Sequence, residues 1–206
     1  MKRILFVISV LFLVIPLIGQ DMYFNLSQAN GVSSFTRNLL PFGVKYSTQT
    51  EVLVGFRLSE SIGLQAGLAY QSAGASNEVT YESPNAETVR ETYSIGFLKI
   101  PVELSMRFGE KLSAGLDIGC YYNLNINQSI GTNASNGEVS GAISVNDLSK
   151  NDFGIRVKPV LDIHLSEKYM ATVGVLQEFG LIECLEKTHH FNTYITFGLK
   201  VLLNDS

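Results

Sequence analysis

The chain has 206 residues, of which 46% are apolar and only 17% are charged, with 15 basic and 19 acidic side chains. Intrinsic disorder is excluded, because disordered chains are polar or charged and poor in aromatic residues. A bundle of membrane helices is excluded too, since after residue 19 no apolar stretch reaches the roughly 18 residues that such a span needs.

The first 19 residues have the pattern of a secretory signal peptide. Lys2 and Arg3 give a basic start, an apolar run covers residues 4–18, and Gly19 is a small residue where a signal peptidase requires one. A membrane-anchor helix is the alternative, but the run is short and Pro16 interrupts it near its end. We therefore expect export. Loss of the two basic residues shifts the formal net charge from −4 to −6, which argues against nucleic acid as a partner.

Beyond the signal, apolar and polar residues alternate with a period of two, as in β-strands whose successive side chains point to opposite faces. The clearest example is residues 112–124, where Leu116 and Ile118 fall on an apolar face and Asp117 and Asn123 on a polar one. The same alternation predicts eight strands, in chain order at residues 22–28, 52–58, 62–71, 98–108, 112–124, 155–165, 169–181 and 191–203.

The connections between these strands alternate in length. Three are tight polar turns, at residues 58–61, 108–111 and 165–168. Four are longer and rich in Asn, Ser, Gly, Thr and Glu, which is typical of loops, at residues 30–46, 73–93, 125–151 and 182–190. Short turns at one end and long loops at the other are the layout of a bacterial outer-membrane barrel.

The sequence thus predicts an all-β fold, an eight-stranded antiparallel up-and-down transmembrane β-barrel, with residues 1–19 as signal peptide and residues 20–206 as the outer-membrane barrel domain. A soluble lipocalin-like barrel also alternates, but it needs a charged exterior. Here the apolar face of the clearest strands carries no charge, and a charge facing lipid near the membrane centre costs about 2–4 kcal/mol. Outer-membrane lipid is therefore the expected surrounding.

The opposite face of the strands predicts a filled interior. Eight strands enclose a space that side chains can just fill, and buried charges must pair. Glu51 is one inward acid. The predicted interior charge network contains Arg57, Lys99, Glu103, Arg107, Asp117, Arg156, Lys158, Asp162, Glu178 and Lys200. This mixture of signs indicates a polar plug rather than a charge-selective pore, which would favour one sign.

Some strand residues carry further expectations. Tyr70, Tyr121, Tyr122 and Phe108 fall near strand ends, where they are either interfacial girdle aromatics or ordinary strand aromatics. In two strands, at positions 101 and 159, a proline removes a ladder hydrogen bond, so we expect bulges there.

The segment Phe97–Phe108, with Leu98, Ile100 and Pro101 at its start, resembles the most recognisable stretch of the PorT-like outer-membrane β-barrel family. Residues 114–119 and the hairpin at residues 54–70 are similar to neighbouring strands of that family. The resemblance covers most of residues 50–125 and implies an eight-stranded outer-membrane barrel. It also implies, as for some members, a part in protein secretion across that membrane. The chain departs from other outer-membrane barrels in ending without a terminal aromatic residue.

No catalytic, cofactor or metal site is predicted. Metal-ligand residue types cluster between Glu183 and His190 without a recognised spacing, which favours a solvated loop. A lipid-modifying site on the loop side would have only His189 and His190 to use, and no nucleophile or phosphate-loop motif is present. The two cysteines, Cys120 facing lipid and Cys184 near the last loop, are expected to be free thiols rather than a disulfide.

Two functions stay open at this point. One is a non-enzymatic component of the envelope, with envelope or secretion-complex proteins as partners. The other is an adhesion or surface-binding barrel that acts through its outer loops. The envelope role predicts that a partner protein no longer binds when turn residues are changed. The surface-binding role predicts that a ligand no longer binds when residues 73–93 or 125–151 are deleted.

Overall fold

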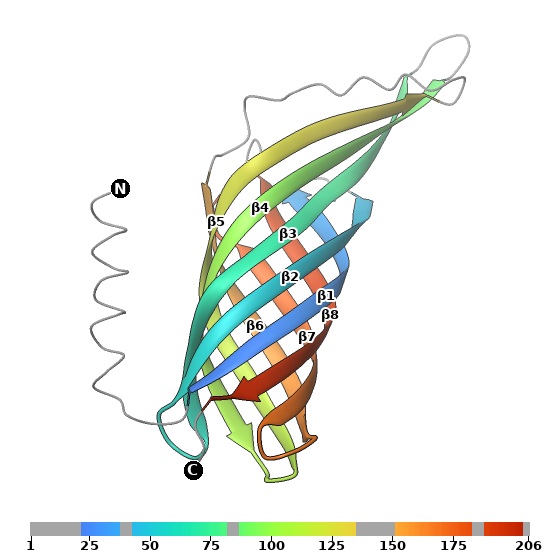
Figure 1. Ribbon diagram of the computed structural model, residues 1–206. Helices are drawn as coiled ribbons and strands as arrows, with labels where there is room; N and C mark the ends of the chain where they lie inside the picture. The colour runs from blue at the N-terminus through green and yellow to red at the C-terminus, as the bar shows by residue number, and fades with distance from the viewer. Residues whose placement is uncertain (1–21, 38–42, 82–86, 135–150, 183–187, 204–206) are drawn as a thin grey trace, which may run out of the picture.

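The structure, a computed structural model, describes residues 22–37, 43–81, 87–134, 151–182 and 188–203. Eight strands follow each other in the order β1 (Met22–Arg37), β2 (Gly43–Arg57), β3 (Ile62–Tyr81), β4 (Glu87–Phe108), β5 (Leu112–Ala134), β6 (Asn151–His164), β7 (Tyr169–Gly180) and β8 (Thr188–Leu202). Each strand pairs antiparallel with the next, and β8 pairs with β1 to close the barrel (Figure 1). The predicted eight-stranded up-and-down barrel is confirmed.

Three tight turns lie together at one end of the barrel, the lower end in Figure 1. In the first turn the amide of Leu58 donates to the carbonyl of Ile62 at 2.8 Å. In the last turn the amide of Leu165 donates to the carbonyl of Tyr169 at 2.9 Å. The middle turn contains Gly109 with φ of 108°, a left-handed conformation that glycine adopts without steric cost. These turns coincide with the predicted ones.

The predicted loops at the other end are largely wrong. Most of residues 30–46, 73–93 and 125–134 continue the strands, because β1 pairs with β2 as far as Ser33↔Lys45, β3 with β4 as far as Tyr81↔Glu87, and β4 with β5 as far as Val89↔Ala134. This protruding sheet, defined as residues 72–81, 87–96 and 125–134, extends well past the other strands (Figure 1). Outside the membrane a barrel strand needs no apolar face toward lipid, so a polar strand there can have the same composition as a loop.

The expected bulges at the strand prolines are also wrong. Pro101 faces Tyr121 and Pro159 faces Leu116 in uninterrupted register with β5. On the opposite side of each proline, in the β3–β4 and β6–β7 ladders, two consecutive residue pairs are missing. The pairing then resumes in the same register. A missing N–H thus interrupts pairing on one side only. The register shifts lie instead between Gly96 and Phe97 and in the stretch between residues 44 and 48.

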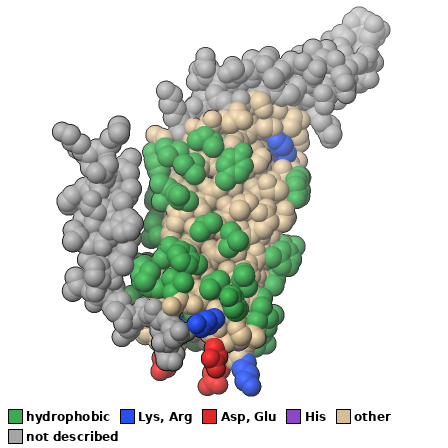
Figure 2. Space-filling model, viewed as in Figure 1, with side chains coloured by type: hydrophobic (Ala, Val, Ile, Leu, Met, Phe, Trp, Pro, Cys, Tyr) green, Lys and Arg blue, Asp and Glu red, His purple; other side chains and the backbone are tan. Residues whose placement is uncertain are grey.

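The barrel wall separates the two faces of the strands as the alternation requires. Apolar side chains such as Leu26, Leu68, Ile118 and Phe197 are 43–55% exposed on the outside. Figure 2 shows this apolar surface, with charged side chains gathered at the short-turn end. Polar and charged side chains fill the inside. Among the described residues, no helix is long and apolar enough to cross a membrane.

Candidate functional site

The centre of the barrel interior is organised around Arg156, on β6. Its side chain is fully buried, with Nη1 2.7 Å from Glu51 Oε2 and Nε 2.7 Å from Glu103 Oε1. Glu178 Oε1 lies 3.9 Å from the same Nε. A planar guanidinium matches several carboxylates at once, which explains why arginine occupies this point. The three acids come from β2, β4 and β7, so this one side chain ties opposite walls of the barrel together.

Two buried lysines extend the central cluster along the barrel. Lys158 Nζ lies 3.4 Å from Glu103 and from Asp117, and 3.6 Å from Glu51. Lys99 Nζ lies 2.5 Å from Glu178 Oε2 and 4.5 Å from the centre of the Tyr121 ring, a cation–π contact. These contacts supply the opposite charges that buried ions need.

A second group of charges lies nearer the short turns. Arg107 contacts Asp117 Oδ1 through Nη1 at 2.5 Å and Asp162 Oδ2 through Nε at 2.7 Å. Lys200 Nζ donates to the same Asp162 oxygen at 2.5 Å, and Thr172 donates to its Oδ1 at 2.7 Å. This group and the central cluster share Asp117, so the described charges form one connected network.

The structure places all ten sequence-predicted interior residues on the inner side of the wall, but not in one cluster. Nine belong to the network just described. Arg57 is half-buried at the end of β2 and lines a cavity at the short-turn end of the barrel.

A polar layer above the network was missed from the sequence. His190 Nδ1 lies 2.9 Å from Asp152 Oδ2, and its Nε2 lies 3.0 Å from the Tyr121 hydroxyl. Asn123 donates to Asp152 at 3.3 Å. The expectation of a solvated loop is wrong for His190, which is 2% exposed within β8. Of the two alternatives for Tyr121, the interfacial girdle is wrong, because this side chain is buried in the interior. Extending the alternation of β6 and β8 back to positions 152 and 190 would have found this layer.

Glycines on neighbouring strands make room for the buried rings. Tyr121 faces Gly154 across β5 and β6, and a Cβ on Gly154 would lie 2.2 Å from the Tyr121 hydroxyl oxygen. Tyr23 covers Gly55 in the same way across β1 and β2. A ring lying over a cross-strand glycine fills the interior while keeping the ladder intact.

Gly154→Ala is expected to displace the Tyr121 ring and the backbone carbonyl of Phe179, which the new Cβ would meet at 2.2 and 2.3 Å, and to lower the unfolding free energy by about 1–3 kcal/mol, the usual cost of overpacking. Urea unfolding followed by circular dichroism measures the change. Gly96→Ala is the matched control, because its Cβ would meet nothing closer than 3.4 Å. Equal loss in both variants would show that strand propensity, rather than the Tyr121 contact, sets the cost.

The described interior offers little for catalysis. His190 and Asp152 form a pair of the kind that activates a nucleophile, but the other ring nitrogen of His190 already faces Tyr121, and the pair is buried away from lipid and water. No group of three or more metal-ligating side chains is found among the described residues. Cys120 is a free cysteine, and Cys184 lies outside the described residues.

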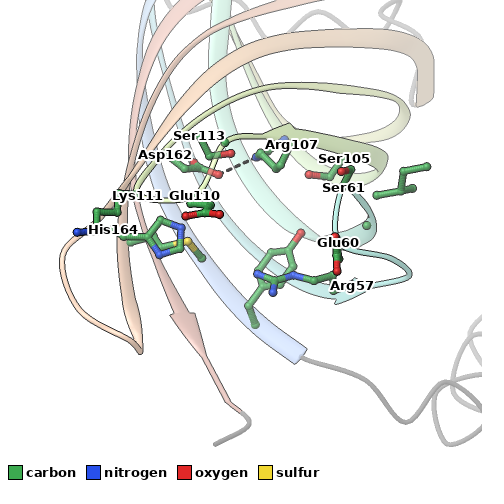
Figure 3. A pocket seen from close by; sticks show the side chains of 15 residues that line it. Arg57, Glu60, Ser61, Ser105, Arg107, Glu110, Lys111, Ser113, Asp162 and His164 are labelled. Atoms are coloured by element: carbon green, nitrogen blue, oxygen red, sulfur yellow. Dashed lines mark hydrogen bonds and ion pairs between the residues drawn. The ribbon is translucent and has the colours of Figure 1, made fainter. Parts of the chain in front are cut away.

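A cavity of about 410 Å³ opens at the short-turn end, beneath the second group of charges (Figure 3). Its lining comes from the first two turns and from the ends of β1 to β7 at this side of the barrel. Charged side chains of both signs line it, among them Arg57, Arg107, Glu60 and Glu110. The buried network lies above it.

Comparison with solved structures supports the outer-membrane fold. The chain is similar to Neisserial surface protein A, at 12% identity, with 87% of this chain and 96% of that chain covered and a TM-score of 0.53. It is also similar to the outer membrane protein OprG from Pseudomonas aeruginosa, at 11% identity, with 90% and 97% covered and a TM-score of 0.51. At these identities the likeness concerns the fold alone.

The sequence comparisons give the family. No curated protein sequence matches this chain. The family model described as outer membrane protein beta-barrel domain matches residues 21–182, well over half of the chain, and such barrels lie in the bacterial outer membrane. The chain therefore belongs to the outer membrane protein beta-barrel domain family.

Proposed function

We propose that this protein is a sealed, non-enzymatic barrel of the outer membrane that acts through the surfaces at its two ends rather than by conducting solutes. The supporting observation is the continuous interior network. Arg156, Lys99, Glu103 and Glu178 are at most 1% exposed, and their partners reach across the barrel. A channel needs a hydrated path, whereas an eight-stranded interior is narrow enough for side chains to fill completely.

A sealed interior predicts no steady conductance. The protein, refolded and inserted into planar lipid bilayers, is expected to give no stable single-channel opening, while a 16-stranded porin in the same membrane gives open channels. The inserted fraction is checked separately by heat-modifiable gel mobility. Stable unitary openings at the frequency of insertion would contradict the proposal.

Two candidate roles follow from the two ends. The resemblance of residues 97–108 to the PorT-like family supports an envelope or secretion-associated role with protein partners on the periplasmic side, where outer-membrane barrels place their short turns. The protruding sheet supports the alternative of binding at the cell surface. β4 has 22 residues and β5 has 23, although a strand needs only about 9–11 to cross the membrane.

A crosslinking experiment separates these roles. A photo-crosslinking amino acid is placed at Glu60 or Glu110 in the short turns, and at Thr92 or Ser129 in the protruding sheet. Native envelopes are irradiated and the products are identified by mass spectrometry. A protein recovered only from the turn positions supports the envelope role. A ligand recovered only from the sheet supports surface binding, and no product from any position counts against both.

A further inference from the structure

The cavity at the short-turn end is lined by two residues with buried hydrogen-bond donors that have no partner in the described part of the protein. Arg107 donates from Nε to Asp162, and from Nη1 to Asp117 and to the carbonyl of Met106. Its Nη2 is buried and has no partner among the described residues. Ser113 is 4% exposed, and its hydroxyl also has no partner within the described part of the chain. Leaving a buried donor unsatisfied is costly, so two at one place point to a ligand.

The two donors converge because of strand register. Arg107 faces Gly115 across β4 and β5, and Ser113 is the next inward position on β5. Diagonal neighbours of this kind lie within reach of a long side chain. Gly115 allows the approach, since a Cβ there would lie 2.5 Å from Arg107 Cδ. Ser113 faces Asp162 on β6, and all three side chains lie together at the inner end of the cavity (Figure 3).

We propose that this cavity binds a monocarboxylate carried on an apolar body. A guanidinium N–H and a hydroxyl are the donors that a carboxylate accepts. Asp162, Glu60 and Glu110 line the same cavity and repel the two charges of a phosphate more strongly than the single charge of a carboxylate. Arg57, Arg107 and Lys111 in the same lining offset that single charge. The buried side chains of Tyr23 and Met170 give the remaining wall an apolar part, and the volume of about 410 Å³ exceeds what a carboxylate alone fills.

The proposal is tested by isothermal titration of the full barrel, refolded in a neutral maltoside detergent. The first probe is N-acetyl-L-phenylalanine, and the matched control ligand is its C-terminal amide, which has the same shape without the charge. We expect the acid to bind roughly tenfold more tightly than the amide, the usual difference for a charge-assisted hydrogen bond. Equal affinity for both, or no binding of either, overturns the proposal.

Two variants locate the site. Ser113→Ala is expected to weaken binding of the acid by roughly fivefold or more without lowering the melting temperature, because its hydroxyl has no partner to lose within the described protein. Ser129→Ala removes a hydroxyl from the protruding sheet at the other end of the barrel, outside the cavity lining, and should leave the affinity unchanged. Equal weakening by both variants would place the carboxylate elsewhere and overturn the assignment.

A second ligand identifies the source of the carboxylate. Octanoate carries the same charge on an acyl chain, whereas N-acetyl-L-phenylalanine resembles a peptide C-terminus. Tighter binding of octanoate assigns the cavity to fatty acids, and tighter binding of the amino acid assigns it to chain ends of periplasmic proteins. In either case the Ser113→Ala effect must persist. This inference is independent of the conductance result, because a sealed interior does not require an occupied cavity.

Discussion

Arg156→Met is expected to lower the unfolding free energy of the barrel by about 3–5 kcal/mol, the cost of breaking a buried ion pair by removing one partner. Arg156 contacts Glu51 and Glu103 at 2.7 Å, and both acids are buried. Without the guanidinium these carboxylates keep their desolvation cost and lose their main stabilising charge. Urea titration of folding into lipid vesicles, together with heat-modifiable gel mobility, measures the loss.

Two further variants make this result interpretable. Lys111→Met removes a charge from the exposed turn before β5 and should cost less than about 0.5 kcal/mol, as surface substitutions do. Arg156→Lys keeps one positive charge but lacks the planar fork that reaches two acids at once, so an intermediate loss is expected. If Arg156→Met and Lys111→Met were equally stable, the interior charges would not determine the stability of the fold.

Ile118→Arg is expected to cost about 2–4 kcal/mol, because it places a charge on the lipid-facing side near the membrane centre. Ile118 is 43% exposed on the outer surface and lies between Leu104 on β4 and Val157 on β6. An arginine at position 118 cannot reach the interior carboxylates, since the side chain at this position points to the outer face of the strand. The same vesicle-folding titration gives the change in free energy.

The matched control is Leu112→Arg, the same substitution at the first residue of β5, next to the short turn. Leu112 is also on the outer surface, but near the water, where the cost of arginine falls to about 0–1 kcal/mol. The difference between the two positions therefore reports membrane depth and not the general effect of arginine on a strand. Equal costs at both positions would contradict a lipid-facing exterior.

Alternation alone was sufficient to predict which strand residues face inward. Lys99, Asp117, Arg156 and Glu178 were assigned to the interior face because successive strand side chains alternate, and the structure places them there. The rule fails where the predicted strands are too short: β6 and β8 begin several residues before the predicted strands at 155–165 and 191–203. Asp152 and His190 follow the parity of β6 and β8, yet the polar composition around them is typical of loops.

The protruding sheet shows a different limit. Residues 73–81 and 87–93 carry no alternation of apolar and polar residues that distinguishes a strand from a loop. Their strand structure depends on the partner. In this region β4 pairs with β3 on one side and with β5 on the other, and no property of a single segment reveals that pairing.

Local composition and the period of two are enough to predict the fold class, the eight strands, the three tight turns and the division into an apolar outside and a charged inside. Which charges meet depends on how the strands are aligned in the closed barrel. Arg156 and Glu51 are 105 positions apart, and Ser47 and Tyr194 are 147 apart. Alternation fixes the face of a side chain but not its height along the barrel, which is set by the register of all eight strands when the barrel closes.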